Sequence, residues 1–292
     1  MIKNIRYELL LLLVAVFWGL GFPAMKSVIG SYGIFSVLWL RFLLAFLMLL
    51  PLCYFKKEFM DVKSMVYGLI LGILLFLIFL LFIKGLSLTS STNTGFLSAL
   101  AIIWVPLINY VVFKKSIEKL AILSIIIAII GVCILSSKSL LNINLNKGDA
   151  FVIMGSLFSA IHILIIDKIS GKVDVLVLIT IQFFIAAILF LIMCILSESL
   201  ILPESWNGDL IVALIVTAVF ATVIAFWIQM RYQSKVSPER ATIIYNLEPI
   251  FSMIFSVVLL HEVLGYNVIF GSLLIFISIF IPILPNLYKQ TV

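Results

Sequence analysis

Charge is scarce in this sequence. Of its 292 residues, 11% are Asp, Glu, Lys or Arg and 64% are apolar, whereas a soluble domain has about 25% charged and under 50% apolar residues. A soluble globule of this composition would expose large apolar patches and aggregate. The shortage of charge therefore excludes a soluble fold and indicates a protein that lies mostly within a lipid bilayer.

Residues that carry metal and redox chemistry are also few. The chain has three cysteines (Cys53, Cys133 and Cys194) and two histidines (His162 and His261). The cysteines fall in different apolar runs, where thiols behave as small apolar groups. No HExxH motif or carboxylate cluster accompanies the histidines. We therefore expect no disulfide, no metal site, no cofactor and no enzymatic activity.

Long apolar runs, by contrast, are abundant. A helix needs about 20 mainly apolar residues to cross roughly 30 Å of hydrocarbon. These runs also lack the two-residue alternation of transmembrane strands. We expect an all-α integral membrane protein with ten transmembrane helices. The predicted spans are 7–29, 34–55, 65–86, 90–113, 120–136, 149–169, 175–196, 210–232, 240–260 and 266–285.

The basic residues are distributed unevenly between the two sides of these spans. Of the 19 Lys and Arg residues, 14 fall on the side of the termini and five on the other, namely Lys26, Arg41, Lys84, Lys138 and Lys147. Cytoplasmic loops carry an excess of Lys and Arg, so both termini are predicted to be cytoplasmic in a multi-pass plasma (inner) membrane protein. Basic loops facing anionic lipid explain the net charge of +6 without a nucleic-acid partner.

A weak internal repeat runs through the sequence. Shifted by 147 residues, segment 92–120 overlies segment 239–267 without a gap. With a shift of 141, Phe17 meets Phe158 and the pair Arg41-Phe42 meets Gln182-Phe183. The identities are sparse, but both shifts align one half of the chain with the other.

Each half of the chain holds five predicted spans. The first repeat covers residues 1–140 and the second covers residues 147–292. Five is an odd number, so the second repeat must enter the membrane from the opposite side. The pattern predicts two inverted five-helix repeats around a central cavity, an architecture typical of transporters.

Several short motifs resemble the EamA-type branch of the drug/metabolite transporter superfamily. The first half contributes Phe17-Trp18-Gly19-Leu20-Gly21-Phe22, Leu40-Arg41-Phe42 and the TGFLSAL run at 94–100. The second half contributes Gly148-Asp149, Leu247-Glu248-Pro249, His261-Glu262 (the family often has Gly-Glu there) and the GSLLI run at 271–275. The resemblance implies a ten-helix transporter of amino acids, drugs, sugars or other metabolites, mostly working outward.

Glu248 is the one carboxylate that the sequence places well inside a span. It lies about eight residues beyond the start of that span, which is about 12 Å along a helix. An ionised carboxylate in lipid costs several kcal/mol, so we expect Glu248 to face the protein interior. There it is a candidate for proton coupling or for binding a substrate amine. Alternatively, it is a structural residue bonded to backbone groups that Pro249 leaves free.

Arg41 is the other charged residue at depth, about seven residues from the outer end of its span. Its long side chain could snorkel outward, close an external gate or hold a substrate carboxylate. We favour snorkelling or gating over direct binding.

Other polar and aromatic side chains at central or inner depths are candidates for lining the cavity. Aromatic rings there can form a cage for a cation, and short polar groups can bond a neighbouring helix or face water. Packing is the alternative for each of them. The substrate-binding candidates are Trp18, Asn93, Ser98, Trp104, His162, Trp227, Tyr245 and Asn246, and the hinge candidates are Pro23, Pro106 and Pro249.

Together these features predict an alternating-access transporter of small metabolites, with amino acids as the first substrate class and export as the direction. Coupling is either to protons through Glu248 or absent. The alternative substrates are organic cations, quaternary ammonium compounds or drugs. The expected partners are a small-molecule substrate and the lipid bilayer, with protons and a homodimer left open. A lipid-modifying enzyme is disfavoured, because it would need clustered carboxylates or histidines that the sequence lacks. A scaffold or sensor is disfavoured as well, because it would have no need of the internal repeat.

Overall fold

Helices make up the described structure. The computed structural model describes residues 2–54, 61–114, 116, 119–136, 146–169, 173–197, 202–232, 235–236, 241 and 244–281, and in these residues the one β-type contact is an isolated bridge between Ile29 and Tyr32. The helices are α1 (Ile2–Lys26), α2 (Ile34–Cys53), α3 (Val62–Leu88), α4 (Ser91–Ser98), α5 (Ala101–Phe113), α6 (Lys119–Leu135), α7 (Lys147–Ile169), α8 (Val175–Ser197), α9 (Gly208–Leu214), the π-helical segment η2 (Ile215–Ile224), α10 (Ala225–Tyr232), α12 (Glu248–Leu260) and α13 (Tyr266–Phe280).

Every predicted span contains a helix. Seven helical segments are long and apolar enough to cross a membrane, and α6, α12 and α13 are shorter apolar helices. The predicted spans 240–260 and 266–285 extend outside the described residues, as does the C-terminal end whose position we predicted. The all-α membrane class is therefore confirmed, and the ten-helix repeat stays a prediction. Of the basic residues used for the orientation, Lys56, Lys57, Lys115, Lys138, Lys172, Arg240 and Lys289 also lie outside the described residues.

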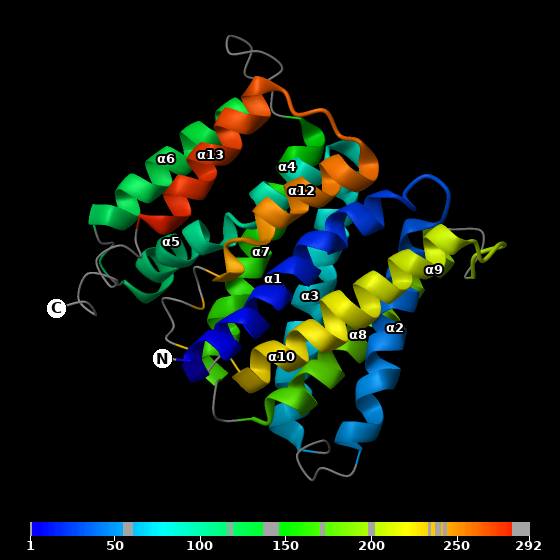
Figure 1. Cartoon of the computed structure of the whole chain (residues 1–292). Helices are drawn as coiled ribbons and strands as arrows, with labels where there is room; N and C mark the ends of the chain where they lie inside the picture. Colours follow the sequence, from blue (N-terminus) through cyan, green and yellow to red (C-terminus); the bar gives the residue numbers. More distant parts are fainter. Residues whose placement is uncertain are drawn as a thin grey trace.

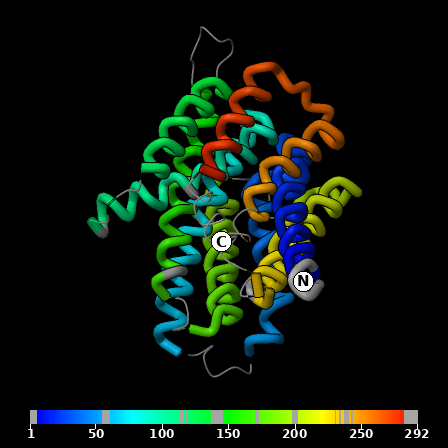
Figure 2. The backbone as a smooth tube through the Cα atoms, turned by 60° about the vertical axis from the view of Figure 1, so that its left-hand side comes forward, coloured from blue at the N-terminus to red at the C-terminus, as the bar shows by residue number. Residues whose placement is uncertain are grey.

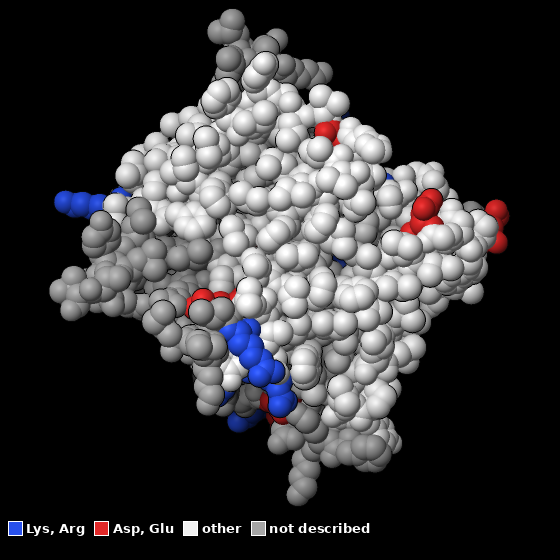
Figure 3. Space-filling view, in the orientation of Figure 1, with Lys and Arg blue, Asp and Glu red and all other residues white. Residues whose placement is uncertain are grey.

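The surface of the helix bundle is apolar, as contact with lipid requires. Large side chains such as Ile129 on α6 and Ile195 on α8 are 59% and 58% exposed. Figure 3 shows a broad face that carries almost no charge, while most Lys, Arg, Asp and Glu side chains gather toward its margins. The shortage of charge in the sequence thus corresponds to a wide surface for lipid contact.

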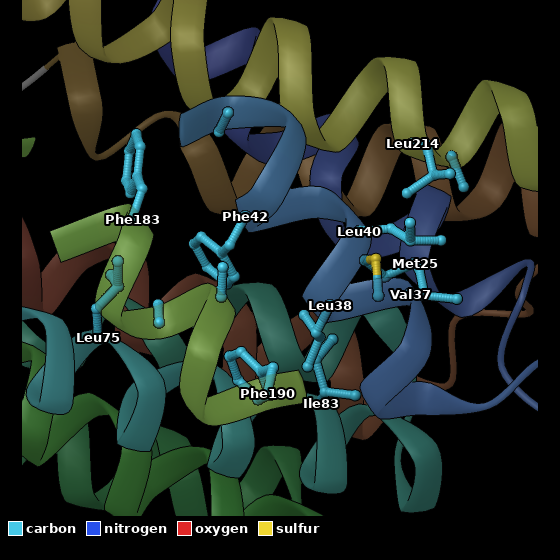
Figure 4. Packing of buried hydrophobic residues seen from close by; sticks show 14 of the residues in the cluster. Met25, Val37, Leu38, Leu40, Phe42, Leu75, Ile83, Phe183, Phe190 and Leu214 are labelled. Atoms are coloured by element: carbon cyan, nitrogen blue, oxygen red, sulfur yellow. The ribbon is translucent and has the colours of Figure 1, made fainter. Parts of the chain in front are cut away.

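Helices from the two halves of the chain pack against one another. α2 packs along α8, α3 packs against α7 and α8, and α1 packs against α12 and η2 (Figure 1), while α6 and α13 lie side by side (Figure 2). The largest core cluster includes side chains of α2, α3 and α8 (Figure 4), where Phe42 stacks on Phe190 with ring centroids 5.7 Å apart. Between helices in lipid, such rings contribute through van der Waals packing, because lipid tails are as apolar as the side chains. The core therefore joins the halves and does not separate them.

Two helices begin directly after a break, 147 residues apart. A turn at Ala99-Leu100 separates α4 from α5, and a turn at Asn246-Leu247 precedes α12. Both α5 and α12 have 13 residues. Each is followed by a residue with left-handed backbone, Lys114 (φ 56°) or His261 (φ 53°), and the described chain has no other non-glycine residue with positive φ. These features recur at the same shift of 147 that the sequence shows.

Two aromatic pairs also recur. The rings of Phe42 and Phe79 lie 5.0 Å apart with planes at 81°, and those of Phe183 and Phe226 lie 5.7 Å apart with planes at 80°. Phe183 follows Phe42 by 141 residues and Phe226 follows Phe79 by 147 residues, the two shifts found in the sequence. Phe42 also meets Phe183 at 6.0 Å, so related positions face each other where α2 packs on α8.

Candidate functional site

Two polar groups at the break before α12 have no hydrogen-bond partner among the described residues. Glu248 is the first residue of α12, and Pro249 stands in the first turn, where a missing N–H costs nothing because these N–H groups have no helical acceptor. The Glu248 side chain is half-buried, and its carboxylate bonds to no described residue. The buried Nδ2 of Asn246 likewise has no acceptor among the described residues. Polar groups at the start of a broken helix are the kind that transporters use to hold a substrate or an ion.

The placement of Pro249 differs from the kink that the sequence suggested. Pro23 and Pro106 lie inside α1 and α5, whereas Pro249 helps to begin a helix. A proline with φ fixed near −65° suits the first turn of a helix. Any hinge here would therefore be the turn at Asn246-Leu247, and not a bend within α12.

Trp18 and Tyr245 lie beside this helix start. Their rings are 5.5 Å apart, and Trp18 Nε1 donates to the Ala221 carbonyl at 3.1 Å. The neighbouring Gly19 brings α1 close to α12, because a Cβ added there would lie 2.9 Å from the Glu248 carbonyl oxygen. The structure thus groups four of the predicted site residues, which are Trp18, Tyr245, Asn246 and Glu248.

Three other predicted site residues lie elsewhere. Trp104 Nε1 donates to Ser156 Oγ at 2.9 Å, between α5 and α7, and Ser98 Oγ donates to a carbonyl of its own helix. Trp227 is 43% exposed and lies against Arg231, whose guanidinium carbon is 5.6 Å from a Trp227 ring centroid. The structure therefore corrects the placement of Trp227, which points away from the interior because it occupies the outward face of α10.

His162 has the hydrogen-bond partner that a buried imidazole needs. Its Nε2 lies 3.0 Å from Oε1 of Gln182, and both side chains are buried between α7 and α8. A buried pair that satisfies itself in this way stabilises the packing of two helices. The sequence had identified His162 without its partner, although the shift of 141 aligns Gln182 with Arg41.

Arg41 points into the protein. It is 6% exposed, and its Nε and Nη2 both donate to Thr222 Oγ1, at 3.3 and 3.1 Å. Its guanidinium carbon lies 4.5 Å from the ring centroid of Phe79 and 5.4 Å from that of Phe42. No carboxylate within the described residues pairs with it. Arg41 thus does not snorkel outward, which corrects one of the two favoured interpretations, and it is a buried charge that no described carboxylate neutralises.

A carboxylate from the second half holds the start of α4. Glu262, in the loop after α12, accepts hydrogen bonds from Ser91 N at 2.7 Å, Thr92 N at 3.2 Å and Thr92 Oγ1 at 2.8 Å. The first N–H groups of a helix lack acceptors and form the positive end of the helix dipole, so a carboxylate there is favourable. This contact ties the loop between α12 and α13 to the break between α3 and α4.

Lys26 and Asp149 extend this contact to α1 and α7. Lys26 Nζ donates to the Leu86 and Thr89 carbonyls at the end of α3. Asp149, 1% exposed, accepts from Thr89 Oγ1 at 2.6 Å and from Asn93 Nδ2 at 3.4 Å. Asn93, predicted to line the cavity, lies here instead because it belongs to the first turn of α4, which begins at this junction. We name these residues the Glu262 network: Lys26, Thr89, Thr92, Asn93, Asp149 and Glu262.

Several residues of these sites were absent from the candidates that the sequence supplied, and four of them hold a predicted site residue or a helix start in place. Gln182 could have been found as the repeat partner of Arg41. Asp149 and Glu262 belong to the Gly148-Asp149 and His261-Glu262 motifs, which were noticed for their resemblance alone. Thr222 carried no signal, since a threonine in an apolar run gives no indication of its partner.

The comparisons with known proteins concern the class of protein. The model of the EamA-like transporter family matches residues 5–137 and 146–284. The chain belongs to the EamA-like transporter family. As a member of a transporter family with several apolar helices, it is a multi-pass membrane transporter.

Three relatives of this EamA-like protein come from Archaeoglobus fulgidus, and each is described as an uncharacterized transporter. They are 31%, 24% and 23% identical over 280, 279 and 285 residues and cover 96%, 94% and 95% of this chain. The matches span 86%, 98% and 97% of the relatives' own lengths. A solved crystal structure shares the fold, with a TM-score of 0.64, 14% identity and coverage of 96% of this chain and 97% of that one.

Proposed function

We propose that this EamA-like protein moves a small metabolite across the plasma membrane by alternating access, with amino acids as the first substrate class and export as the direction. The observation that carries the proposal is that the Glu248 carboxylate at the start of α12 and the neighbouring Asn246 amide have no partner among the described residues. A buried polar group without a partner is costly to keep. A substrate or a proton that binds there would offset this cost in part of the cycle.

Alternating access requires two halves that can rock against each other, and we propose that the chain consists of two inverted repeats. Three matched features support this: the breaks before α5 and α12, the left-handed residues after them, and the paired phenylalanines described above. The helix contacts also correspond between the halves. The contact of α3 with α7 corresponds to that of η2 with α1. Likewise, the contact of α5 with α7 corresponds to that of α12 with α1. Such symmetry provides two conformations of similar energy that open to opposite sides.

We further propose that the Glu262 network closes the outer side in this conformation. The predicted orientation places the loop after α12 on the outer face. Glu262 belongs to the second half and Thr92 to the first, so their contact must break when the halves separate on that side. Opening would then release the α4 amides to water.

An organic cation is the second candidate substrate, and a specific observation favours it. Glu248 is an acid that no described residue pairs with, and the Trp18 and Tyr245 rings lie 5.5 Å apart beside it. Aromatic faces attract cations through the ring quadrupole, and a carboxylate would supply the counter-charge. In this alternative the transported group would be an amine or a quaternary ammonium.

A ligand screen on the purified protein tests this proposal. Thermal unfolding in detergent would be followed with the standard amino acids, with their decarboxylated amines and with a set of quaternary ammonium compounds. Stabilisation by amino acids, lost in Glu248→Gln and retained in the exposed control Glu204→Gln, supports the first candidate. Stabilisation by the amines and quaternary compounds alone supports the second. A protein that no member of the three sets stabilises would contradict both.

A further inference from the structure

Arg41 has hydrogen-bonding capacity that the structure leaves unused. A guanidinium carries five N–H donors in a planar fork, and here Nε and Nη2 share a single acceptor, Thr222 Oγ1. In the described part of the chain the Nη1 group donates to nothing. Phe79 covers one face of the guanidinium at 4.5 Å, which fixes the plane in which the remaining donors lie.

The second half of this chain has a bonded pair at the related positions. Gln182 aligns with Arg41 at the shift of 141, and it bonds to His162 on the preceding helix at 3.0 Å. The residue that aligns with His162 at the same shift is Gly21. The first half therefore keeps the polar residue on α2 but lacks the side chain on α1 that would satisfy it.

Space remains beside Gly21. Gly21 is buried, yet a Cβ added there would meet within 4 Å only the Ala221 Cβ, at an ordinary contact distance of 3.8 Å. At Gly19, two residues earlier, an added Cβ would lie 2.6 Å from the Phe251 Cβ. α1 is thus closely packed at Gly19 but has room at Gly21. The segment nearest to Gly21 is Ala221-Thr222, and Thr222 is the residue that binds Arg41.

We propose that the Gly21 side of Arg41 is a subsite for the carboxylate group of the transported molecule. The inference rests on the proposed transport function and narrows its substrate class to carboxylate-bearing metabolites. A carboxylate matches the free edge of a guanidinium in two parallel hydrogen bonds. Thr222, which is bonded to Thr217 O at 2.7 Å within η2, sets the position of the guanidinium. The substrate carboxylate takes the place that the His162 imidazole fills in the second half.

Binding measurements on the full chain in detergent test the subsite with matched ligands. For every standard amino acid, the affinities of the acid, its carboxamide and its decarboxylated amine are compared by calorimetry, together with a phosphate monoester of similar size. The wild type is expected to bind at least one acid more tightly than its amide or amine. A preference for the phosphate ester over every acid would overturn the assignment to a carboxylate.

Two kinds of variant localise that preference. Arg41→Gln is expected to weaken binding of the acid by about tenfold to a hundredfold, the range of a charge-assisted hydrogen bond, and to leave the amine unchanged. Gly21→His introduces the group that the second half carries and is expected to abolish binding of the acid, which keeps the test valid if Arg41→Gln does not fold. Gln182→Ala is the matched control and should alter neither ligand's affinity. Equal losses of affinity for acid and amine in the Arg41 and Gly21 variants would refute the subsite, and would leave the proposed transport intact. Failure of the proposed transport would appear in a separate flux measurement, as an absence of flux for every ligand.

Discussion

Glu262 and Thr92 are joined across the two halves of the chain by a hydrogen bond of 2.8 Å between Oγ1 of Thr92 and Oε2 of Glu262. The same carboxylate accepts the Ser91 amide at 2.7 Å. A residue after α12 therefore supplies the acceptors that the start of α4 lacks. Glu262 of the His261-Glu262 motif therefore has a structural role, which is to cap the start of α4.

Removal of this carboxylate should loosen the start of α4. In Glu262→Ala the amides of Ser91 and Thr92 lose their acceptor, so their hydrogen exchange is expected to accelerate by roughly tenfold, since a charged hydrogen bond contributes about 1.5 kcal/mol or more. Hydrogen exchange with mass spectrometry on peptides covering 89–98 measures this. The control is Glu204→Ala, which removes an exposed carboxylate. Unchanged exchange in the Glu262 variant would show that the contact does not hold α4.

The two glycines of α1 should respond differently to a methyl group. Gly19→Ala places a Cβ 2.6 Å from the Phe251 Cβ and 2.9 Å from backbone atoms of α12, so overpacking should cost about 1–3 kcal/mol. Gly21→Ala meets only an ordinary contact and should be neutral or slightly stabilising, because alanine favours a helix over glycine by about 1 kcal/mol. Thermal unfolding of both variants in detergent measures the difference. Equal melting temperatures would contradict the close approach of α1 and α12.

The His162–Gln182 hydrogen bond should be detectable as a coupling energy. Replacement of either residue by leucine leaves the other buried and unsatisfied, which should cost about 1–3 kcal/mol. The double variant removes both polar groups and should lose less than the sum of the single variants. Unfolding free energies of the four proteins in a double-mutant cycle provide the coupling. Strict additivity would mean that the two side chains do not depend on each other.

The membrane class and the extents of most helices could be predicted from the sequence, because lipid imposes long apolar segments. α2, expected over 34–55, is found at Ile34–Cys53, and α8, expected over 175–196, is found at Val175–Ser197. The break before α12 was anticipated only as a hinge at Pro249, and its position one turn earlier could not be predicted, because Asn246, Glu248 and Pro249 are also compatible with a continuous kinked helix. Glu248 was therefore expected eight residues inside a continuous helix and is found as the first residue of a new one.

The partners of the buried polar residues were the part that the sequence could not supply. Thr222 lies 181 residues from Arg41, and Glu262 lies 170 residues from Thr92. Contacts over such distances depend on how the two halves pack, which short motifs do not encode. The internal repeat was the exception, because its two shifts relate Gln182 to Arg41 and Gly21 to His162 and so lead to the proposed carboxylate subsite.

Transport is tested most directly by flux through proteoliposomes that contain the full chain. The amino acid that stabilises the protein best would be supplied in labelled form outside vesicles loaded with the unlabelled compound, with and without a pH gradient. Alternating access predicts transient accumulation of label in wild-type vesicles and in Glu204→Gln vesicles, and proton coupling through Glu248 predicts that Glu248→Gln loses the response to the pH gradient. A gradient response that survives in Glu248→Gln would contradict the role of this residue. Folded wild-type protein that exchanges no label for any stabilising ligand would contradict transport.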